Sequence, residues 1–103
     1  METSGQGDLL AEAYRLQGEL LLRQALPDAS QAEACFQQAL AAARRQQAKS
    51  WELRVALSLS RLWQGQGKRA KARELLAPVY GWFTEGFDTP DLQEASALLT
   101  ALA

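Results

Sequence analysis

The chain has 103 residues, 48% of them hydrophobic, and a formal net charge of -1, which predicts a single globular domain. The slightly acidic balance argues against a dedicated nucleic-acid binder, because such proteins carry a basic surplus. No apolar run approaches the roughly 20 residues that cross a membrane, and the start METSGQGD does not resemble a secretory signal.

The commonest residues are alanine, leucine, glutamine, arginine and glutamate, which are good helix formers, so we predict an all-α fold. Cys35 is the single cysteine and cannot form an internal disulfide. It precedes Phe36 on the predicted inward face of a helix, so we expect a buried structural thiol and not a nucleophile. Together with the missing signal sequence, this predicts a cytoplasmic protein.

The first helix is expected to follow a small, polar and disordered segment, residues 1–7. Asp8 is a plausible N-cap for the run LLAEAYRLQGELLLRQAL. One face of this helix carries Leu10, Tyr14, Gly18 and Leu21. Pro27 and Asp28 then interrupt the pattern.

The second helix is predicted from about Gln31 to Gln47. Ser30 and Glu33 have the spacing of a capping box, in which each side chain bonds the other residue's backbone amide. The inward positions are Ala32, Cys35, Phe36, Ala39 and Leu40.

The third and fourth helices form a pair around a glycine turn. Ser50 is expected to cap a helix beginning at Trp51, and Gly65 and Gly67 are expected to end it. Inward residues of the pair are Ala56, Leu59, Ser60, Trp63, Ala72, Leu75, Leu76 and Val79. Pro78 falls inside the fourth helix, where it removes one backbone hydrogen bond, so we expect a kink near Leu75–Pro78.

The last helix is predicted from Pro90 to about Leu102. Thr89 as N-cap, Pro90 at the first helical position and Asp91 in the first turn are a strong helix start. One face is apolar, with Leu92, Ala95, Leu98, Leu99 and Leu102. The other is polar, with Gln93, Glu94, Ser96 and Thr100, as expected of a helix that closes an array.

The two helix pairs can be superposed as repeats. Small residues recur where the helices of a pair would touch, Gly18 with Ala32 and Ser60 with Ala72. This pattern is typical of the tetratricopeptide repeat (TPR), although the spacing departs from 34 residues. We predict a domain over 8–103 with repeats at about 9–48 and 50–82, a capping helix at about 90–102 and right-handed superhelical packing. An unrelated helical bundle is the alternative.

Longer stretches resemble a known group of proteins. LAEAYRLQGELLL, AEACFQQALAAAR and the run from WELRVALSLSRLWQGQGKRAKARELLAPVY through GWFTEGFDTPDLQEASALL are similar to the C-terminal TPR region of large bacterial signalling proteins. In those proteins an ATPase core is joined to a nucleotide cyclase or DNA-binding regulator domain. The resemblance implies a non-catalytic regulatory tail, and this chain carries no phosphate-binding loop motif.

The predicted concave face is formed by the first helix of each pair. Its candidate partner-binding residues are Glu12, Arg15, Glu19, Arg23, Arg54, Leu57, Arg61 and Gln64. The arginines would suit a peptide carboxylate through charge-assisted hydrogen bonds. The alternative is that they pair with Glu12 and Glu19 and bind nothing.

The remaining chemistry is sparse. There is no histidine, and no Ser, Cys or carboxylate has the partners of a catalytic set, so we predict no enzyme activity, no metal and no cofactor. A basic cluster is formed by Lys68, Arg69, Lys71 and Arg73. Charged residues are mostly exposed in proteins, so we expect this cluster to be a solvated surface and not an anion-binding site.

The sequence therefore predicts a protein–protein interaction or regulatory scaffold module, with a small-ligand or peptide sensor as the alternative. The expected partners are a protein or peptide, not a nucleic acid or a membrane. A homodimer is also expected through apolar surface on the first helix, at Leu9, Leu16, Leu22 and Leu26.

Overall fold

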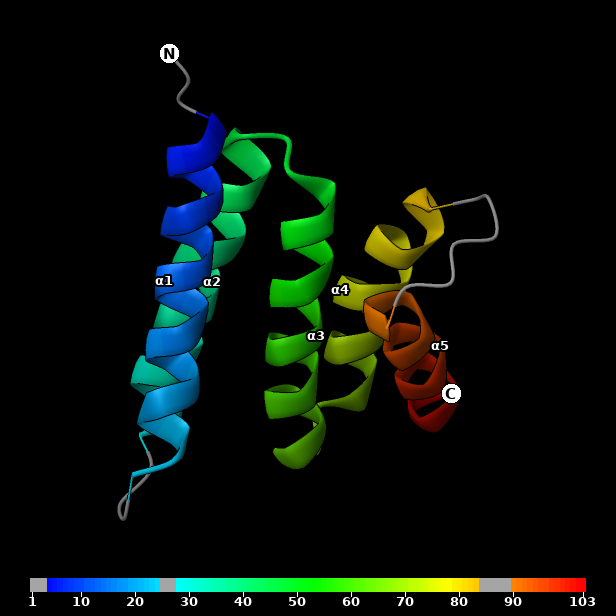
Figure 1. Cartoon of the computed structure of the whole chain (residues 1–103). Helices are drawn as coiled ribbons and strands as arrows, with labels where there is room; N and C mark the ends of the chain where they lie inside the picture. The colour runs from blue at the N-terminus through cyan, green and yellow to red at the C-terminus, as the bar shows by residue number, and fades with distance from the viewer. Residues whose placement is uncertain (1–3, 25–27, 84–89) are drawn as a thin grey trace.

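The computed structural model describes residues 4–24, 28–83 and 90–103, and within these ranges the regular structure is helical throughout (Figure 1). The described helices are α1 (Ser4–Leu22), α2 (Ala29–Arg45), α3 (Lys49–Gly65), α4 (Arg69–Trp82) and α5 (Pro90–Leu102). The predicted all-α class is confirmed.

The helices are arranged in two layers. α1, α3 and α5 lie in the layer nearer the viewer in Figure 1, and α2 and α4 lie behind them. Each helix packs against the next one in the chain, and α3 also contacts α1 and α5, whereas α2 and α4 do not meet within the described ranges. The Cα extents of 40 × 29 × 19 Å fit a short row of helices two layers thick, since packed helices lie about 8–10 Å apart.

The turns after α2 and α3 have the same geometry. Gln47 and Gly67 have φ angles of 54° and 80°, which lie in the left-handed region. The amide of Ala48 donates to the carbonyl of Ala43 at 2.9 Å, and the equivalent bond after α3 is 2.8 Å long. These are Schellman motifs, which satisfy carbonyls left unpaired at a helix end. Gly67 is therefore the residue that turns the chain, and Gly65 is the last residue of α3.

This shared turn gives the middle of the chain a regular spacing. α2, α3 and α4 begin at residues 29, 49 and 69, so their starts are 20 residues apart. A pair of helices thus advances by 40 residues, compared with 34 in a TPR. The spacing therefore differs from that of the standard repeat, and the predicted TPR packing stays a prediction.

Two predicted helix starts are corrected. α1 begins at Ser4, so residues 4–7 are helical and not disordered, and Asp8 lies inside the helix instead of capping it. α2 begins at Ala29, because the side chain of Asp28 accepts a 3.1 Å hydrogen bond from the amide of Gln31. Asp28 therefore performs the capping that the sequence assigned to Ser30.

The start of α3 also differs from the prediction. It begins at Lys49 after Ala48, whose side chain forms no capping hydrogen bond, and Ser50 lies in the first turn. The fifth helix begins at Pro90, as predicted, and its expected cap Thr89 lies outside the described residues.

α3 is the centre of the hydrophobic core, because it packs against all four other helices. Its buried residues include Leu53, Val55, Ala56, Leu57, Leu59 and Trp63. Ala32, Phe36, Ala39 and Leu40 of α2, Ala72, Leu76 and Val79 of α4, and Leu92, Ala95, Leu98 and Leu102 of α5 complete the core. The inward faces of α2, α4 and α5 are mostly those that the helical periodicity predicts, whereas α3 also buries Leu53, Val55 and Leu57, which the prediction did not place inward. Cys35 is only half-buried.

The small-residue contacts are confirmed for one pair and shifted in the other. Ser60 is buried and its hydroxyl donates to the main-chain oxygen of Ala72 at 3.3 Å. In the first pair, a Cβ placed on Gly18 would lie 2.7 Å from Cε1 of Phe36. Gly18 therefore accommodates the Phe36 ring and not, as predicted, Ala32.

Pro78 lies inside α4 without ending it, and the helix continues to Trp82. Pro78 and Glu74 are both exposed, so the carbonyl left without its amide partner is on the solvent side of the helix. The predicted kink stays a prediction.

Candidate functional site

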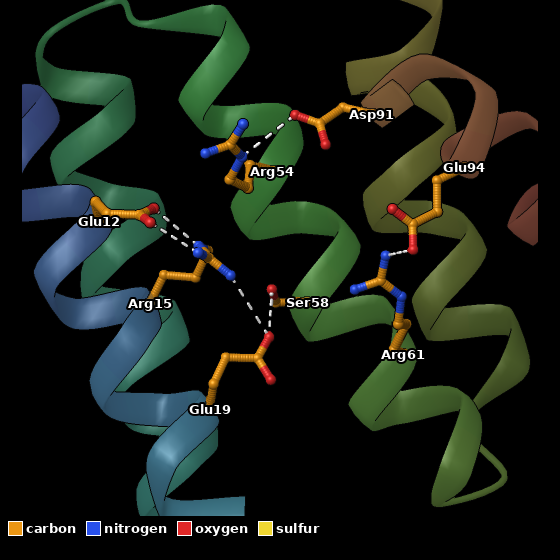
Figure 2. A network of polar contacts seen from close by, with 8 residues as sticks. All are labelled: Glu12, Arg15, Glu19, Arg54, Ser58, Arg61, Asp91 and Glu94. Carbon is orange, nitrogen blue, oxygen red and sulfur yellow. Dashed lines mark hydrogen bonds and ion pairs between the residues drawn. The ribbon is translucent and has the colours of Figure 1, made fainter. Parts of the chain in front are cut away.

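The layer of α1, α3 and α5 presents a face of charged and polar side chains (Figure 2). We call this set the charged face: Glu12, Arg15 and Glu19 of α1, Arg54, Ser58 and Arg61 of α3, and Asp91 and Glu94 of α5. On each helix these residues are three or four positions apart, which places them on one side of the helix.

Arg15 joins the carboxylates of α1. Its Nε and Nη2 donate to the two oxygens of Glu12 at 2.9 and 2.8 Å, a two-pronged geometry that favours strong pairing. Its Nη1 lies 3.7 Å from Oε2 of Glu19. The hydrogen bond from Arg15 holds the pKa of Glu12 below its ordinary value, and the same bond raises the pKa of Arg15.

Glu19 and the arginines of α3 connect the three helices of the layer. The hydroxyl of Ser58 donates to Oε2 of Glu19 at 2.9 Å, which ties α1 to α3. Nε of Arg54 lies 3.3 Å from Oδ2 of Asp91, and Arg61 forms an ion pair with Glu94. Figure 2 shows these contacts running across the face from α1 to α5.

The structure thus brings together five of the predicted concave-face residues, Glu12, Arg15, Glu19, Arg54 and Arg61. Leu57 is buried beneath them and lines a hollow of about 170 Å³ between the charged side chains. Arg23 and Gln64 are exposed and take no part in the contacts of Figure 2.

Sequence reasoning missed the contribution of α5. Glu94 was expected on a polar outer face, but it points across the layer to Arg61. Asp91 and Glu94 are three residues apart, which was the available signal, yet only packing shows that α5 lies beside α3. Ser58 is not among the predicted site residues, yet its hydroxyl donates to Glu19.

The pairing changes what this face can bind. Four carboxylates surround three arginines, and each arginine has a carboxylate partner. An incoming peptide carboxylate would have to displace one of these partners. The geometry therefore disfavours the predicted carboxylate site, and of the three arginines only Arg15 pairs with Glu12 and Glu19 as the alternative prediction held.

A cleft opens beside the charged face, between the C-terminal halves of α1 and α3. Its volume is about 390 Å³, which is within the range of small-molecule sites. It is lined by Glu19, Leu22, Ala29, Ser58, Arg61, Leu62, Gly65 and Gln66. The lining is mostly apolar and carries one carboxylate, Glu19, and one guanidinium, Arg61, so it suits a small ligand with an apolar body.

The basic cluster has a structural role. Arg69 Nη2 donates to the main-chain oxygens of Ala101 and Ala103 at 2.9 and 3.3 Å, and Arg73 Nη1 donates to that of Leu102 at 3.2 Å. Cations at a helix C-terminus stabilise its unpaired carbonyls. The ammonium of Lys71 lies 4.6 Å from the ring centroid of Trp63.

The predicted dimer residues are only partly on one surface. Leu16 is 46% exposed, but Leu22 packs partly buried against the core and lines the cleft, so it does not belong to an outer face. The side chains of Leu9 and Leu26 lie outside the described residues. The exposed leucines of α1 are instead Leu10, Leu16 and Leu20, at 41%, 46% and 63%; we call them the outer face of α1.

No protein-family model matches the chain, and neither the curated proteins nor the solved structures gave a match. Among the described residues, no three His, Cys, Asp or Glu side chains are grouped closely enough to hold a metal ion. In the part of the chain that is described, no helix is both long enough and apolar enough to pass through a membrane.

Proposed function

We propose that this chain is a non-catalytic protein–protein interaction module of the TPR kind, a regulatory scaffold related to the bacterial signalling proteins that its sequence resembles. The two-layer order of helices supports a stacked array, because such arrays bury each helix pair against its neighbours. The observation that carries the proposal is the outer face of α1, where exposed leucines stand at one end of the row.

The outer face of α1 is not covered by another helix within the described residues. α1 contacts α2 and α3 within the described residues, and Leu10, Leu16 and Leu20 remain 41%, 46% and 63% exposed. A cluster of exposed leucines on one helix is typical of a contact surface. In a longer array, a preceding helix pair would cover it.

A second copy of the chain is the partner that fits this face most directly. Leu16 and Leu20 are four residues apart and therefore lie on the same side of α1, whereas Leu10 lies about a third of a turn around the helix from Leu16. In an antiparallel two-fold pairing, Leu16 meets Leu20 of the second copy, and Leu20 meets Leu16. Such self-complementary contacts are the commonest route to dimers.

The test is the mass in solution, measured by light scattering after size exclusion at micromolar concentration. We expect a dimer for the natural chain and a monomer for Leu20→Glu, because this residue is 63% exposed and its replacement leaves the core intact. Ala97→Glu adds the same charge on an exposed position of α5 and should stay dimeric. A natural chain that elutes as a monomer contradicts the second copy as partner.

The cleft between α1 and α3 favours one alternative, a sensor of small ligands or peptides. Its size and apolar floor support this role. A thermal-shift screen with metabolites and peptides separates the two, because a ligand that binds only the folded state raises the midpoint of unfolding. Binding lost in Glu19→Gln, with dimerisation unchanged, would favour the sensor.

A further inference from the structure

Trp82 is an exposed tryptophan on a surface that the functions above do not use. Its side chain is 57% exposed, whereas Trp63 in the core is 4% exposed. Tryptophan has a large apolar ring, so leaving it in water forgoes a substantial gain from burial. Exposed tryptophans are also enriched among the residues that dominate binding energy at interfaces.

The ring of Trp82 is held in place from two sides. It meets Phe83 edge-on, with ring centroids 5.1 Å apart and an interplanar angle of 80°. The ammonium of Lys49 lies 5.4 Å from the Trp82 ring centroid. These contacts restrain the ring and leave more than half of it accessible, so it offers a preorganised apolar platform.

Beside Trp82, a nearly buried carboxylate lies beneath two more exposed cations. Glu52 is almost buried, with 7% of its side chain exposed, and pairs with Arg44 at 3.0 Å and with Lys49 at 3.4 Å. The two cations are 55% and 37% exposed. One carboxylate thus lies beneath two outward cations, so the side toward the α2–α3 turn carries one excess positive charge. Toward α4, Glu74 balances that charge.

Two adjoining hollows flank the platform. One has a volume of about 680 Å³ and extends to Gln47, Ser50 and Phe83; the other has about 240 Å³ and extends along α4. Both are lined by Arg44, Lys49, Glu52 and Trp82, and we call the combined space the Trp82 groove. It lies between α2 and α4, which do not touch in the described ranges.

We propose that the Trp82 groove binds an acidic peptide segment of a partner protein. An aromatic or aliphatic side chain of the peptide packs on the Trp82 ring, and its carboxylates pair with Arg44 and Lys49. Glu74 borders the smaller hollow and repels carboxylates there. The acidic residues therefore lie toward the larger hollow, on the side of the α2–α3 turn.

Single-stranded nucleic acid is the competing class, since bases also stack on aromatic rings beside cations. Such sites combine several aromatic platforms with a basic track along the backbone. The groove has one exposed tryptophan and two cations that share a carboxylate, which fits a short acidic peptide better. Its residues come from α2, α3 and α4, so the site is independent of the outer face of α1.

The experiment is a selection from a random twelve-residue peptide library displayed on phage, run on the immobilised full chain and on Trp82→Ala. We expect enriched peptides with two or more acidic residues next to an aromatic or leucine, and no enrichment on the variant. Circular dichroism and the midpoint of thermal unfolding check that the variant folds. No enrichment on the natural chain, enrichment of basic peptides, or equal enrichment on Trp82→Ala overturns the proposal.

The dissociation constant of one enriched peptide then tests the contribution of each side chain of the groove. A second peptide, in which the corresponding amides replace the acidic residues, is the paired probe. We expect Trp82→Ala to weaken binding at least tenfold and Lys49→Gln several-fold, and the amide peptide to bind several-fold more weakly. Two exposed control variants, Leu20→Ala and Lys68→Gln, should leave the affinity unchanged. Equal loss in the controls, or tighter binding of a fluorescent dT12 oligonucleotide than of the peptide, overturns it.

Discussion

The two ends of the helix row are held to the molecule by different interactions. α1 packs against α2 through close contact, with Gly18 against the ring of Phe36 and Ala11 fully buried. α5 adds polar contacts to its apolar face: Arg69 and Arg73 bind its C-terminal carbonyls, and Asp91 and Glu94 pair with arginines of α3.

The outward surfaces of the two ends differ as well. α1 exposes leucines, whereas the exposed positions of α5 carry small or polar side chains: Pro90, Gln93, Glu94, Ser96, Ala97, Thr100 and Ala101. A polar end suits termination of an array, and an apolar end suits continuation by another helix. Packing thus fixes α1, the end with exposed leucines, while charged contacts add to the interactions that hold α5, the polar end.

The largest effect is expected where α1 packs most closely. Gly18→Leu should lower the free energy of unfolding by about 3 kcal/mol, because even a Cβ there would approach the Phe36 ring to 2.7 Å. Gly65→Ala is the matched control. A Cβ there meets nothing within 4 Å, so it should raise stability by about 0.5 kcal/mol through helix propensity. Denaturant melts measure both, and equal effects would contradict the packing described for α1.

A smaller effect is expected at the other end. The double change Arg69→Gln and Arg73→Gln should lower the free energy of unfolding by about 1 kcal/mol, because exposed cations at a helix C-terminus contribute a few tenths to 1 kcal/mol each. Amide hydrogen exchange should accelerate in α5 and stay unchanged in α1. Exchange that rises equally in both helices would show that these arginines do not hold α5 specifically.

Ionic strength should affect the two ends of the helix row differently. Raising ionic strength screens exposed charges, so exchange in α5 of the natural chain should accelerate toward that of the double variant. Exchange in α1 should change less, because its contact with α2 is apolar and its Arg15 ion pairs are only 16–29% exposed. The variant itself should respond less to salt than the natural chain.

The smallest effect concerns Glu12 and pH. Its pKa is lowered below the ordinary 4.5 by the hydrogen bond from Arg15, so its ionised form stabilises the fold. This contribution is present above pH 4.5 and is lost as the pH falls through the lowered pKa. Glu12→Gln should therefore cost about 0.5 kcal/mol at pH 7 and nothing near pH 2.

Denaturant melts of the natural chain and Glu12→Gln across this range give the difference. Glu74→Gln, an exposed change on α4, should give curves parallel to those of the natural chain. A difference for Glu12→Gln that persists at the lowest pH would contradict the role of its charge.

The inward faces of the helices were predictable from sequence, because apolar residues recur with the period of the helix. Phe36, Leu76 and Ala95 are fully buried where the periodicity placed them. The helix starts were less predictable. Asp28 and Ser30 both have capping chemistry, and only the path of the chain decides which side chain meets the free amide of Gln31.

The candidate site could be predicted only in part, because some of its contacts join residues that are far apart in the sequence. The spacing of Arg15, Arg54 and Arg61 placed them on one side of their helices, but the carboxylates that pair with the latter two come from α5. Asp91 follows Arg54 by 37 residues, and no local rule connects positions so far apart. Arg73 is a second example. In the sequence it is part of a basic cluster, whereas in the fold its guanidinium donates to the main-chain oxygen of Leu102 at the end of α5.

The sequence by itself determined the helical class and one buried side of α2, α4 and α5, because both depend on residues within one or two turns of each other. That α3 is buried on more than one side follows from its central place in the fold. Only the tertiary structure decided which charges are paired. It also decided that α1, at one end of the helix row, carries exposed leucines and that Trp82 is exposed to solvent. These properties depend on which helix lies beside which, and that is set by the sum of many weak contacts between distant segments.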